Sequence, residues 1–174
     1  MTDASTLIQS IRKEFGPIPF PLHCGLHAAV AKDDWVDDED ELRSITQSSD
    51  YIGEWWDVPL EHLLKCKMAL SYLDSAGMEF YLPAYMIAVL EHPTGFDKAR
   101  VISSSWQIIF TFIPDADDLE LQAYFHERFS RIVDGKKGVC RDFLKYVAEG
   151  GAHDLHAKEL ASEALANGYW VVDS

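Results

Sequence analysis

Residues 55–92 read WWDVPLEHLLKCKMALSYLDSAGMEFYLPAYMIAVLEH, and this stretch decides the fold class. Its apolar residues recur at spacings of three and four, the period of an α-helix with a buried face. The spacing predicts one helix over residues 58–74 and another over residues 82–91. Each has a proline near its start, Pro59 or Pro83, where the missing N–H costs least. The short, glycine-containing link predicts two antiparallel neighbours at the centre of the molecule.

The first of these helices is apolar on two sides, which predicts neighbours on both. One row is Leu60, Leu64, Met68 and Tyr72, and the other is Leu63, Cys66, Leu70 and Leu73. Replacing a core residue such as Leu64 or Met86 with alanine is expected to cost about 2–5 kcal/mol through cavity formation.

Further amphipathic helices are predicted in the rest of the chain. The first covers residues 4–15, and a short second one runs from the acidic run at 33–41 to about residue 48. A third has Leu121, Tyr124, Phe125, Phe129 and Ile132 as its buried face, and a fourth is lined by Val139, Phe143, Tyr146 and Val147. The last runs from about Asp154 to Asn167. Residues 134–138 are predicted as a turn. Residues 101–113 fit either a helix or a strand, and we favour the helix because its surroundings are helical. The expected fold is mainly α: a single globular domain over residues 1–174, a bundle of about six or seven helices with at most a minor strand element.

The composition is strongly acidic. Among 174 residues, 15 Lys and Arg oppose 29 Asp and Glu, a net charge of −14. Such a surface repels nucleic acid and anionic membranes and attracts cationic partners. No apolar stretch approaches the roughly 18 residues of a membrane span, and the N-terminus lacks a signal-peptide pattern. Cys24, Cys66 and Cys140 show no CxxC spacing, which predicts reduced thiols and a cytoplasmic protein.

The negative charge is concentrated in residues 33–41, DDWVDDEDE, with seven carboxylates in nine residues. The run lacks the spacing of a calcium loop. A solvated acidic face is one interpretation, but a tryptophan among charges is typical of interface hot spots. We therefore predict a partner-binding site, extended by a second acidic group if the fold brings it alongside. The candidate residues are Asp33, Asp34, Trp35, Asp37, Asp38, Glu39, Asp40 and Glu41, with Asp115, Asp117, Asp118 and Glu120 in the second group.

Two other groups of residues could support chemistry, but neither has the spacing of a known site. The first group is His23, Cys24 and His27, which would supply metal ligands or a thiolate with a base. A zinc site needs about four well-spaced ligands, and this group offers three. The second group is His153, His156 and Glu159, which lack the i, i+4 histidine pair of zinc proteases. We expect structural roles for both groups, and therefore no catalytic residues, no cofactor and no bound transition metal.

Several segments also carry a resemblance to a known family. The most specific is FYLPAYM at residues 80–86. The others are Ile11 to Phe15 with the prolines that follow, EWWDVPL at 54–60, VCRDFL at 139–144 with Tyr146, and Ala164-Leu165 ahead of Tyr169-Trp170. Together they resemble an uncharacterised bacterial family, domain of unknown function 6714, over nearly the whole chain. The resemblance implies a small cytoplasmic bacterial protein without an accepted activity, so it carries over no catalytic residues.

The sequence therefore favours a binding protein over an enzyme. The predicted function is an immunity protein that binds and neutralises a cognate, basic antibacterial toxin. An acidic inhibitor gains association rate from the opposite field of such a toxin and can cover its active site. The alternatives are a cytoplasmic helical adaptor for an unknown partner, and a metal-dependent hydrolase using carboxylates and histidines from residues 23–41 and 153–159. No nucleic acid and no membrane is expected as a partner, and the oligomeric state stays open.

Overall fold

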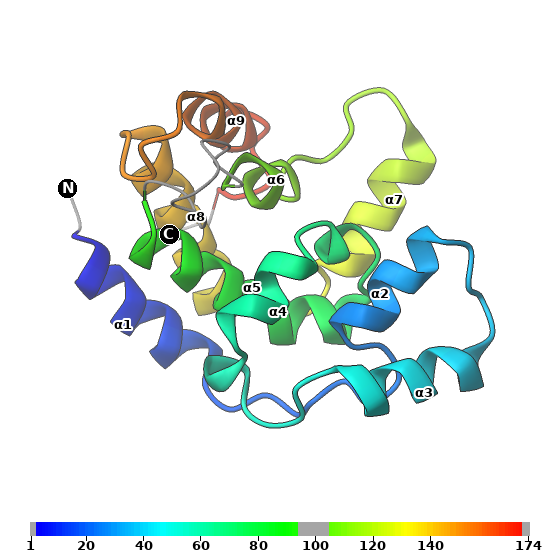
Figure 1. Cartoon of the computed structure of the whole chain (residues 1–174). Coiled ribbons are helices and arrows are strands. Elements are labelled where there is room, and N and C mark those ends of the chain that lie inside the picture. Colours follow the sequence, from blue (N-terminus) through cyan, green and yellow to red (C-terminus); the bar gives the residue numbers. More distant parts are fainter. Residues whose placement is uncertain (1–2, 94–104, 172–174) are drawn as a thin grey trace.

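The computed structural model describes residues 3–93 and 105–171, and every regular element in these two ranges is helical (Figure 1). The elements are α1 (Ala4–Phe15), α2 (Leu26–Asp33), α3 (Glu39–Ser49), η1 (Trp55–Asp57), α4 (Leu60–Lys65), η2 (Ala69–Ser71), α5 (Ser75–Glu91), α6 (Ser105–Phe110), α7 (Leu119–Arg128), α8 (Asp134–Ala148) and α9 (Leu155–Ala166), where η marks a 3₁₀ helix. The mainly α prediction is confirmed. The described ranges hold nine α-helices, more than the six or seven expected, because α2 was not predicted and α6 lies in the segment that fits either a helix or a strand.

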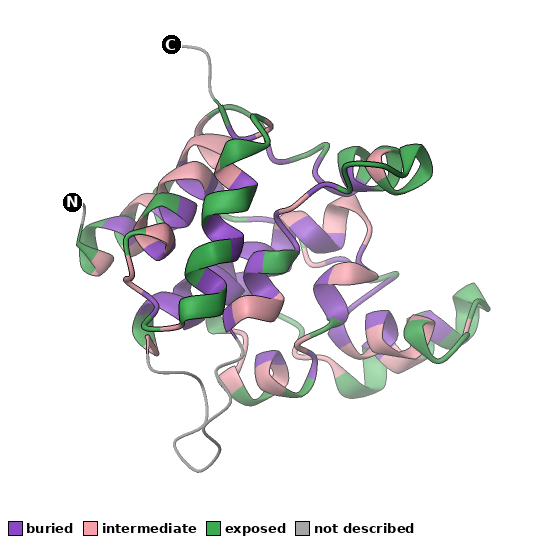
Figure 2. Cartoon of the chain, turned by 90° about the horizontal axis from the view of Figure 1, so that it is seen from above, coloured by how far each residue is buried: buried purple, intermediate pink, exposed green. Residues whose placement is uncertain are grey.

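Helix α5 forms the centre of the molecule. It contacts α1, α4, α6 and α7, and every residue from Phe80 to Leu90 is buried. Figure 2 shows the buried residues gathered in the interior, with exposed residues on the surrounding helices. A helix that is apolar around its whole circumference needs neighbours on all sides. The predicted central position of this segment is therefore confirmed.

The start of α5 differs from the prediction, which placed a break at residues 74–77 and the helix at 82–91. The Asp74 carboxylate accepts a hydrogen bond from the N–H of Gly77 at 2.8 Å and so caps the helix. Gly77 therefore lies in the first turn of α5, and Pro83 lies inside the helix. The prediction was wrong because it gave the two helix breakers more weight than a capping aspartate followed by a long apolar run.

The predicted helix over residues 58–74 is in fact two short elements, α4 and η2. Side chains from distant elements bind carbonyls near the break: the hydroxyl of Tyr85 donates to the carbonyl of Cys66, and Arg128 donates to the carbonyl of Leu70 at 2.7 Å. Such long-range bonds leave no local sequence signal. One predicted row, Leu63, Cys66, Leu70 and Leu73, is buried as expected, whereas Leu60, Leu64 and Tyr72 are half-buried and Met68 is exposed.

The C-terminal helices pack beside α1. Helix α8 contacts both α1 and α9, and α9 also contacts α6. Gly150 and Gly168 have φ angles of +97° and +85°, and they end α8 and α9 as predicted. Trp170 folds back onto the core, where its indole N–H donates to the carbonyl of Phe112 at 2.9 Å.

Three local predictions in this half need correction or completion. Residues 134–138 are the first turn of α8, not a free turn. Leu121 and Tyr124 were expected to be buried, but both are exposed on α7. Residues 101–113 fit either a helix or a strand in the sequence, and the structure is helical at Ser105–Phe110. Residues 101–104 lie outside the described part of the chain. Within the described ranges, no helix combines the length and the apolar character that a membrane span requires.

Candidate functional site

The chain between α2 and α3 carries the acidic run, and residues 33–41 are called the acidic arm below. Helices α2 and α3 contact each other, and the connection between them follows the outer edge of the molecule in Figure 1. All seven carboxylates of the acidic arm belong to exposed residues. Asp38 caps α3 by accepting the N–H of Glu41 at 2.8 Å, and Glu39, Asp40 and Glu41 complement the helix dipole. The predicted helix start at the acidic run is thus confirmed.

Trp35 is the most exposed large apolar residue described, with 93% of its surface accessible. Its φ angle is +66°, a left-handed conformation that is unfavourable for a bulky residue. The cause is the end of α2: the N–H of Trp35 donates to the carbonyl of Lys32, and the N–H of Val36 donates to that of Ala31, both at 3.1 Å. This pair of bonds is the Schellman motif, in which the left-handed position usually belongs to glycine.

The end of α8 provides an internal comparison. There the N–H of Gly150 donates to the carbonyl of Val147, and the N–H of Gly151 donates to that of Tyr146. The geometry is the same motif, with glycine in the left-handed position at φ +97°. In α2, the chain places an exposed tryptophan where it uses glycine elsewhere.

The second acidic group lies at the start of α7. Asp115 accepts backbone hydrogen bonds from Asp118 and Asp117, which lower the pKa of its carboxyl, and Asp118 caps α7. In Figure 1 this start and the acidic arm lie on the same side of the molecule. The contacts that link them are indirect: the hydroxyl of Tyr72 donates to Asp33, while the hydroxyl of Tyr124 on α7 donates to the neighbouring carbonyl of Ser71. Adjacency of the two acidic groups therefore stays a prediction.

The structure also assembles a group that the sequence did not indicate, formed by His27, Asp50 and His62. One ring nitrogen of each histidine and one carboxylate oxygen of Asp50 all lie within 4.8 Å of one another. The residues come from α2, the C-terminal cap of α3, and α4. The sequence segment around His27 supplies no such partners, so the predicted role of His27 is structural. Its partners follow 23 and 35 residues later, a separation that matches no short ligand motif.

The other predicted chemistry candidates have ordinary surroundings. His23 pairs with Asp74, and His156 lies 4.0 Å from Glu159 with both side chains mostly exposed. The remaining histidine of that group, His153, is exposed. Among the described residues, none of these three histidines belongs to a cluster of metal-ligating side chains.

The three cysteines are buried free thiols. Burial raises the pKa of Cys24, Cys66 and Cys140, and that of Cys66 reaches about 11. A thiol with a raised pKa is protonated near neutral pH, and the protonated form is a poor nucleophile. These surroundings do not favour a thiolate and its base at His23 and Cys24.

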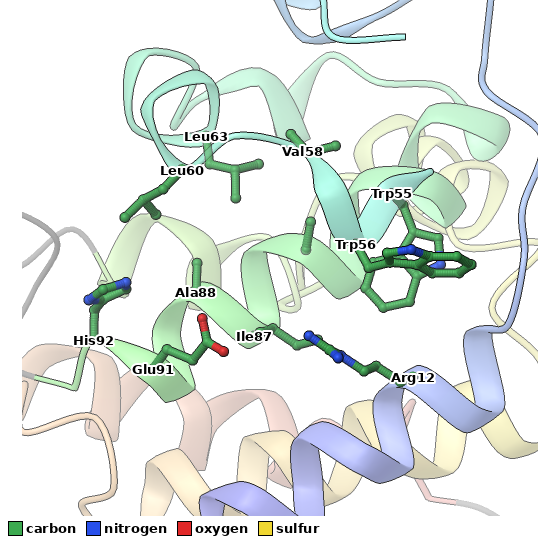
Figure 3. A pocket seen from close by; sticks show the side chains of 11 residues that line it. Arg12, Trp55, Trp56, Val58, Leu60, Leu63, Ile87, Ala88, Glu91 and His92 are labelled. Atoms are coloured by element: carbon green, nitrogen blue, oxygen red, sulfur yellow. The ribbon is translucent and has the colours of Figure 1, made fainter. Parts of the chain in front are cut away.

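A small hollow lies between α1, α4 and α5 (Figure 3). Arg12 and Glu91 lie on one side of it, while Leu60 and Val58 lie on the other. Its volume is about 100 Å³. Small-molecule sites usually enclose about 300–1,000 Å³, so this hollow has room for a few waters but not for a substrate of ordinary size.

The family comparison supports the resemblance seen in the sequence. A model of a family of unknown function (DUF6714) matches residues 3–174. No curated protein and no solved structure is significantly similar to this chain.

Proposed function

Since this chain belongs to the family of unknown function DUF6714, we propose a function from its own surface: it is an acidic binding protein whose partner is a basic protein. The acidic arm is the proposed contact surface. The single observation that carries the proposal is the exposed Trp35 in a left-handed backbone conformation. An exposed tryptophan in such a position contributes little to the fold, whereas tryptophan is enriched among the residues that dominate binding energy.

The charge around Trp35 supports a cationic partner. Among the described ion pairs, the acidic arm takes part in one, between Asp40 and a guanidinium nitrogen of Arg43 at 3.3 Å. Asp33 accepts the Tyr72 hydroxyl and Asp38 caps α3, but neither contact supplies a positive charge. The exposed carboxylates of the arm therefore repel one another, and the molecule as a whole carries a net charge of −14. A basic partner relieves this repulsion and associates faster because of the opposite field.

The finer form of the proposal is an immunity protein. In this role the chain binds a cognate antibacterial toxin in the cytoplasm and covers its active site with the acidic arm. A toxin that acts on nucleic acid is basic in order to bind phosphates, so an acidic surface with a central aromatic is chemically complementary to it. A helical adaptor that binds another basic protein would use the same surface, and the partner's identity separates the two roles.

Binding kinetics with the product of the adjacent gene test the proposal. The variant Asp37→Asn, Asp40→Asn, Glu41→Gln removes three charges and leaves the Asp38 cap in place. We expect association to slow several-fold at low salt, because steering acts mainly on the association rate. The difference should vanish near 1 M salt, where the Debye length is about 3 Å.

The matched control removes three charges from exposed positions, one at the C-terminal cap of α8 and two on α9. It is Glu149→Gln, Glu159→Gln, Glu163→Gln, which changes the net charge equally. Equal slowing in both triple variants would mean that only net charge matters and that the acidic arm is not the contact. For the immunity role, co-expression with the adjacent gene product should protect cells from it. Growth arrest despite tight binding would contradict that finer form.

A further inference from the structure

The cluster of His27, Asp50 and His62 has a buried carboxylate at its centre. The side chain of Asp50 is 1% exposed, and that of His27 is 26% exposed. Oδ1 of Asp50 accepts the backbone N–H of His27 at 3.1 Å and lies 2.8 Å from Nδ1 of its ring. Gly25 makes room for this carboxylate, since a Cβ there would lie 2.0 Å from Oδ2 of Asp50. The packing thus places an ionisable group deep among three helical elements.

Two atoms of the cluster are left without a protein partner. Oδ2 of Asp50 and Nδ1 of His62 are both buried, and neither has a hydrogen-bond partner among the described residues. Buried polar atoms are nearly always paired, so two such atoms in one cluster point to a ligand. The rings of His27 and His62 lie edge to face with centroids 5.2 Å apart, which puts the second imidazole beside the first.

A purely structural role explains only half of this arrangement. Asp50 does stabilise the N-terminus of α2 through the His27 N–H, and it orients the ring of that histidine. Both roles use Oδ1 alone. They leave Oδ2 and the His62 nitrogen unexplained, and a capping role for α2 requires no second histidine.

The three groups are the ligand types of a known class of metal site. Two imidazoles and one carboxylate hold zinc in hydrolases and non-haem iron in oxygenases, with the remaining positions open to water. Ligand atoms about 2.0–2.2 Å from a zinc ion lie roughly 3.3 Å from one another. The three ligand atoms lie up to 4.8 Å from one another. Bringing them to the separation around a zinc ion needs side-chain shifts of about 1 Å, which small rotamer adjustments supply. An ion at this place replaces the hydrogen bond between Nδ1 of His27 and Oδ1 of Asp50.

We propose that His27, Asp50 and His62 bind one divalent transition-metal ion, with zinc as the reference ion and water in the remaining position. This reverses the expectation of no metal, which rested on local spacing alone. The ion ties α2, the C-terminal cap of α3 and α4 together, at the end of the α2–α3 pair that lies away from the acidic arm. The proposal is independent of the proposed function, because it concerns the metal content of the free chain and needs no protein partner.

Metal content and cobalt binding test the site on the full, untagged chain, since a histidine tag binds the same ions. Elemental analysis of protein purified without chelators should give close to one zinc per chain. After removal of the metal, Co²⁺ should produce a visible d–d absorption that saturates at one equivalent and disappears when zinc is added. The ligand variant His62→Gln should weaken Co²⁺ binding at least 10-fold.

The control is His23→Gln, which changes an exposed histidine outside the cluster that pairs with Asp74. It should bind Co²⁺ as the unchanged chain does. Asp50→Asn is the second ligand variant, and circular dichroism reports whether each variant keeps its helices. Absence of zinc together with no saturable Co²⁺ absorption in the unchanged chain would overturn the proposal, and a buried water would then satisfy the two atoms. Unchanged affinity in folded His62→Gln would also overturn it.

Discussion

At the scale of single residues, burial separates two positions that the sequence treated alike. Met86 on α5 is fully buried, whereas Leu64 on α4 is only half-buried. We expect Met86→Ala to lower the free energy of unfolding by about 2–5 kcal/mol through the cavity it leaves. Leu64→Ala should cost clearly less, because solvent already reaches part of that side chain. Denaturant unfolding of both variants measures the difference, and equal costs would contradict the assigned burial.

Residue patterns in the sequence identified the acidic arm and Trp35, because charge density and an isolated aromatic are visible without a fold. The same reading missed the cluster around Asp50. Asp50 follows two serines at the end of an exposed helix, and its partners His27 and His62 are 23 and 12 residues away. Only the packing of three elements brings the groups within 4.8 Å, and no local pattern encodes that packing.

At the scale of elements, the Asp74 cap determines where α5 begins. Burial acts to raise the pKa of this carboxyl, but hydrogen bonds from the Gly77 N–H and from His23 outweigh it, so that the pKa is lowered overall. A lowered pKa in the folded state means that the carboxylate stabilises the fold above the unfolded pKa. This contribution is lost as the pH falls through the folded value.

The corresponding variants are Asp74→Ala and Asp74→Asn. We expect Asp74→Ala to cost about 0.5–2 kcal/mol near neutral pH, and Asp74→Asn to cost less because asparagine also caps helices. The penalty of Asp74→Ala should begin to shrink as the pH falls below about 4, the ordinary pKa of an aspartate, and shrink further toward the lowered pKa of the folded chain. Thermal unfolding across pH 3–7 measures this trend. A penalty that stays constant over the range would mean that the charge of Asp74 contributes nothing to the cap.

Helix ends marked by glycine were predictable, and the helix break shaped by distant contacts was not. The sequence predicted α1 with the same bounds and placed the ends of α8 and α9 at their glycines. It merged α4 with η2 because the break at Cys66 contains neither proline nor glycine. The break is stabilised by Tyr85 and Arg128, which lie 19 and 62 residues further along the chain.

At the scale of the whole molecule, the core and the proposed contact surface are separate. The core is organised around α5, and the acidic arm lies outside it at the edge of the α2–α3 pair (Figure 1). The spacing of apolar residues and the composition were together enough to predict a helical globular protein with an acidic surface. It could not show which acidic residues share a face, because that depends on how α2, α3 and α7 are placed in space.

The most direct test of the central claim compares stability and binding in the single variant Trp35→Gly. Glycine suits the left-handed position, which costs another residue about 1–2 kcal/mol, although its greater freedom in the unfolded chain offsets roughly half of that. We expect the free energy of unfolding to stay unchanged or to rise by up to about 1 kcal/mol. Dissociation from the adjacent gene product should accelerate at least 10-fold, because truncating a hot-spot tryptophan costs about 2 kcal/mol or more.

The control is Leu155→Ala, which truncates another exposed apolar side chain, at the start of α9, and should leave dissociation unchanged. The decisive measurement is therefore the dissociation rate of Trp35→Gly, recorded with its unfolding free energy. Trp35→Gly should be at least as stable as the unchanged chain and should release its partner faster. A variant that releases its partner at the original rate, or that loses more than about 1 kcal/mol of stability, would contradict the assignment of Trp35 to binding rather than folding.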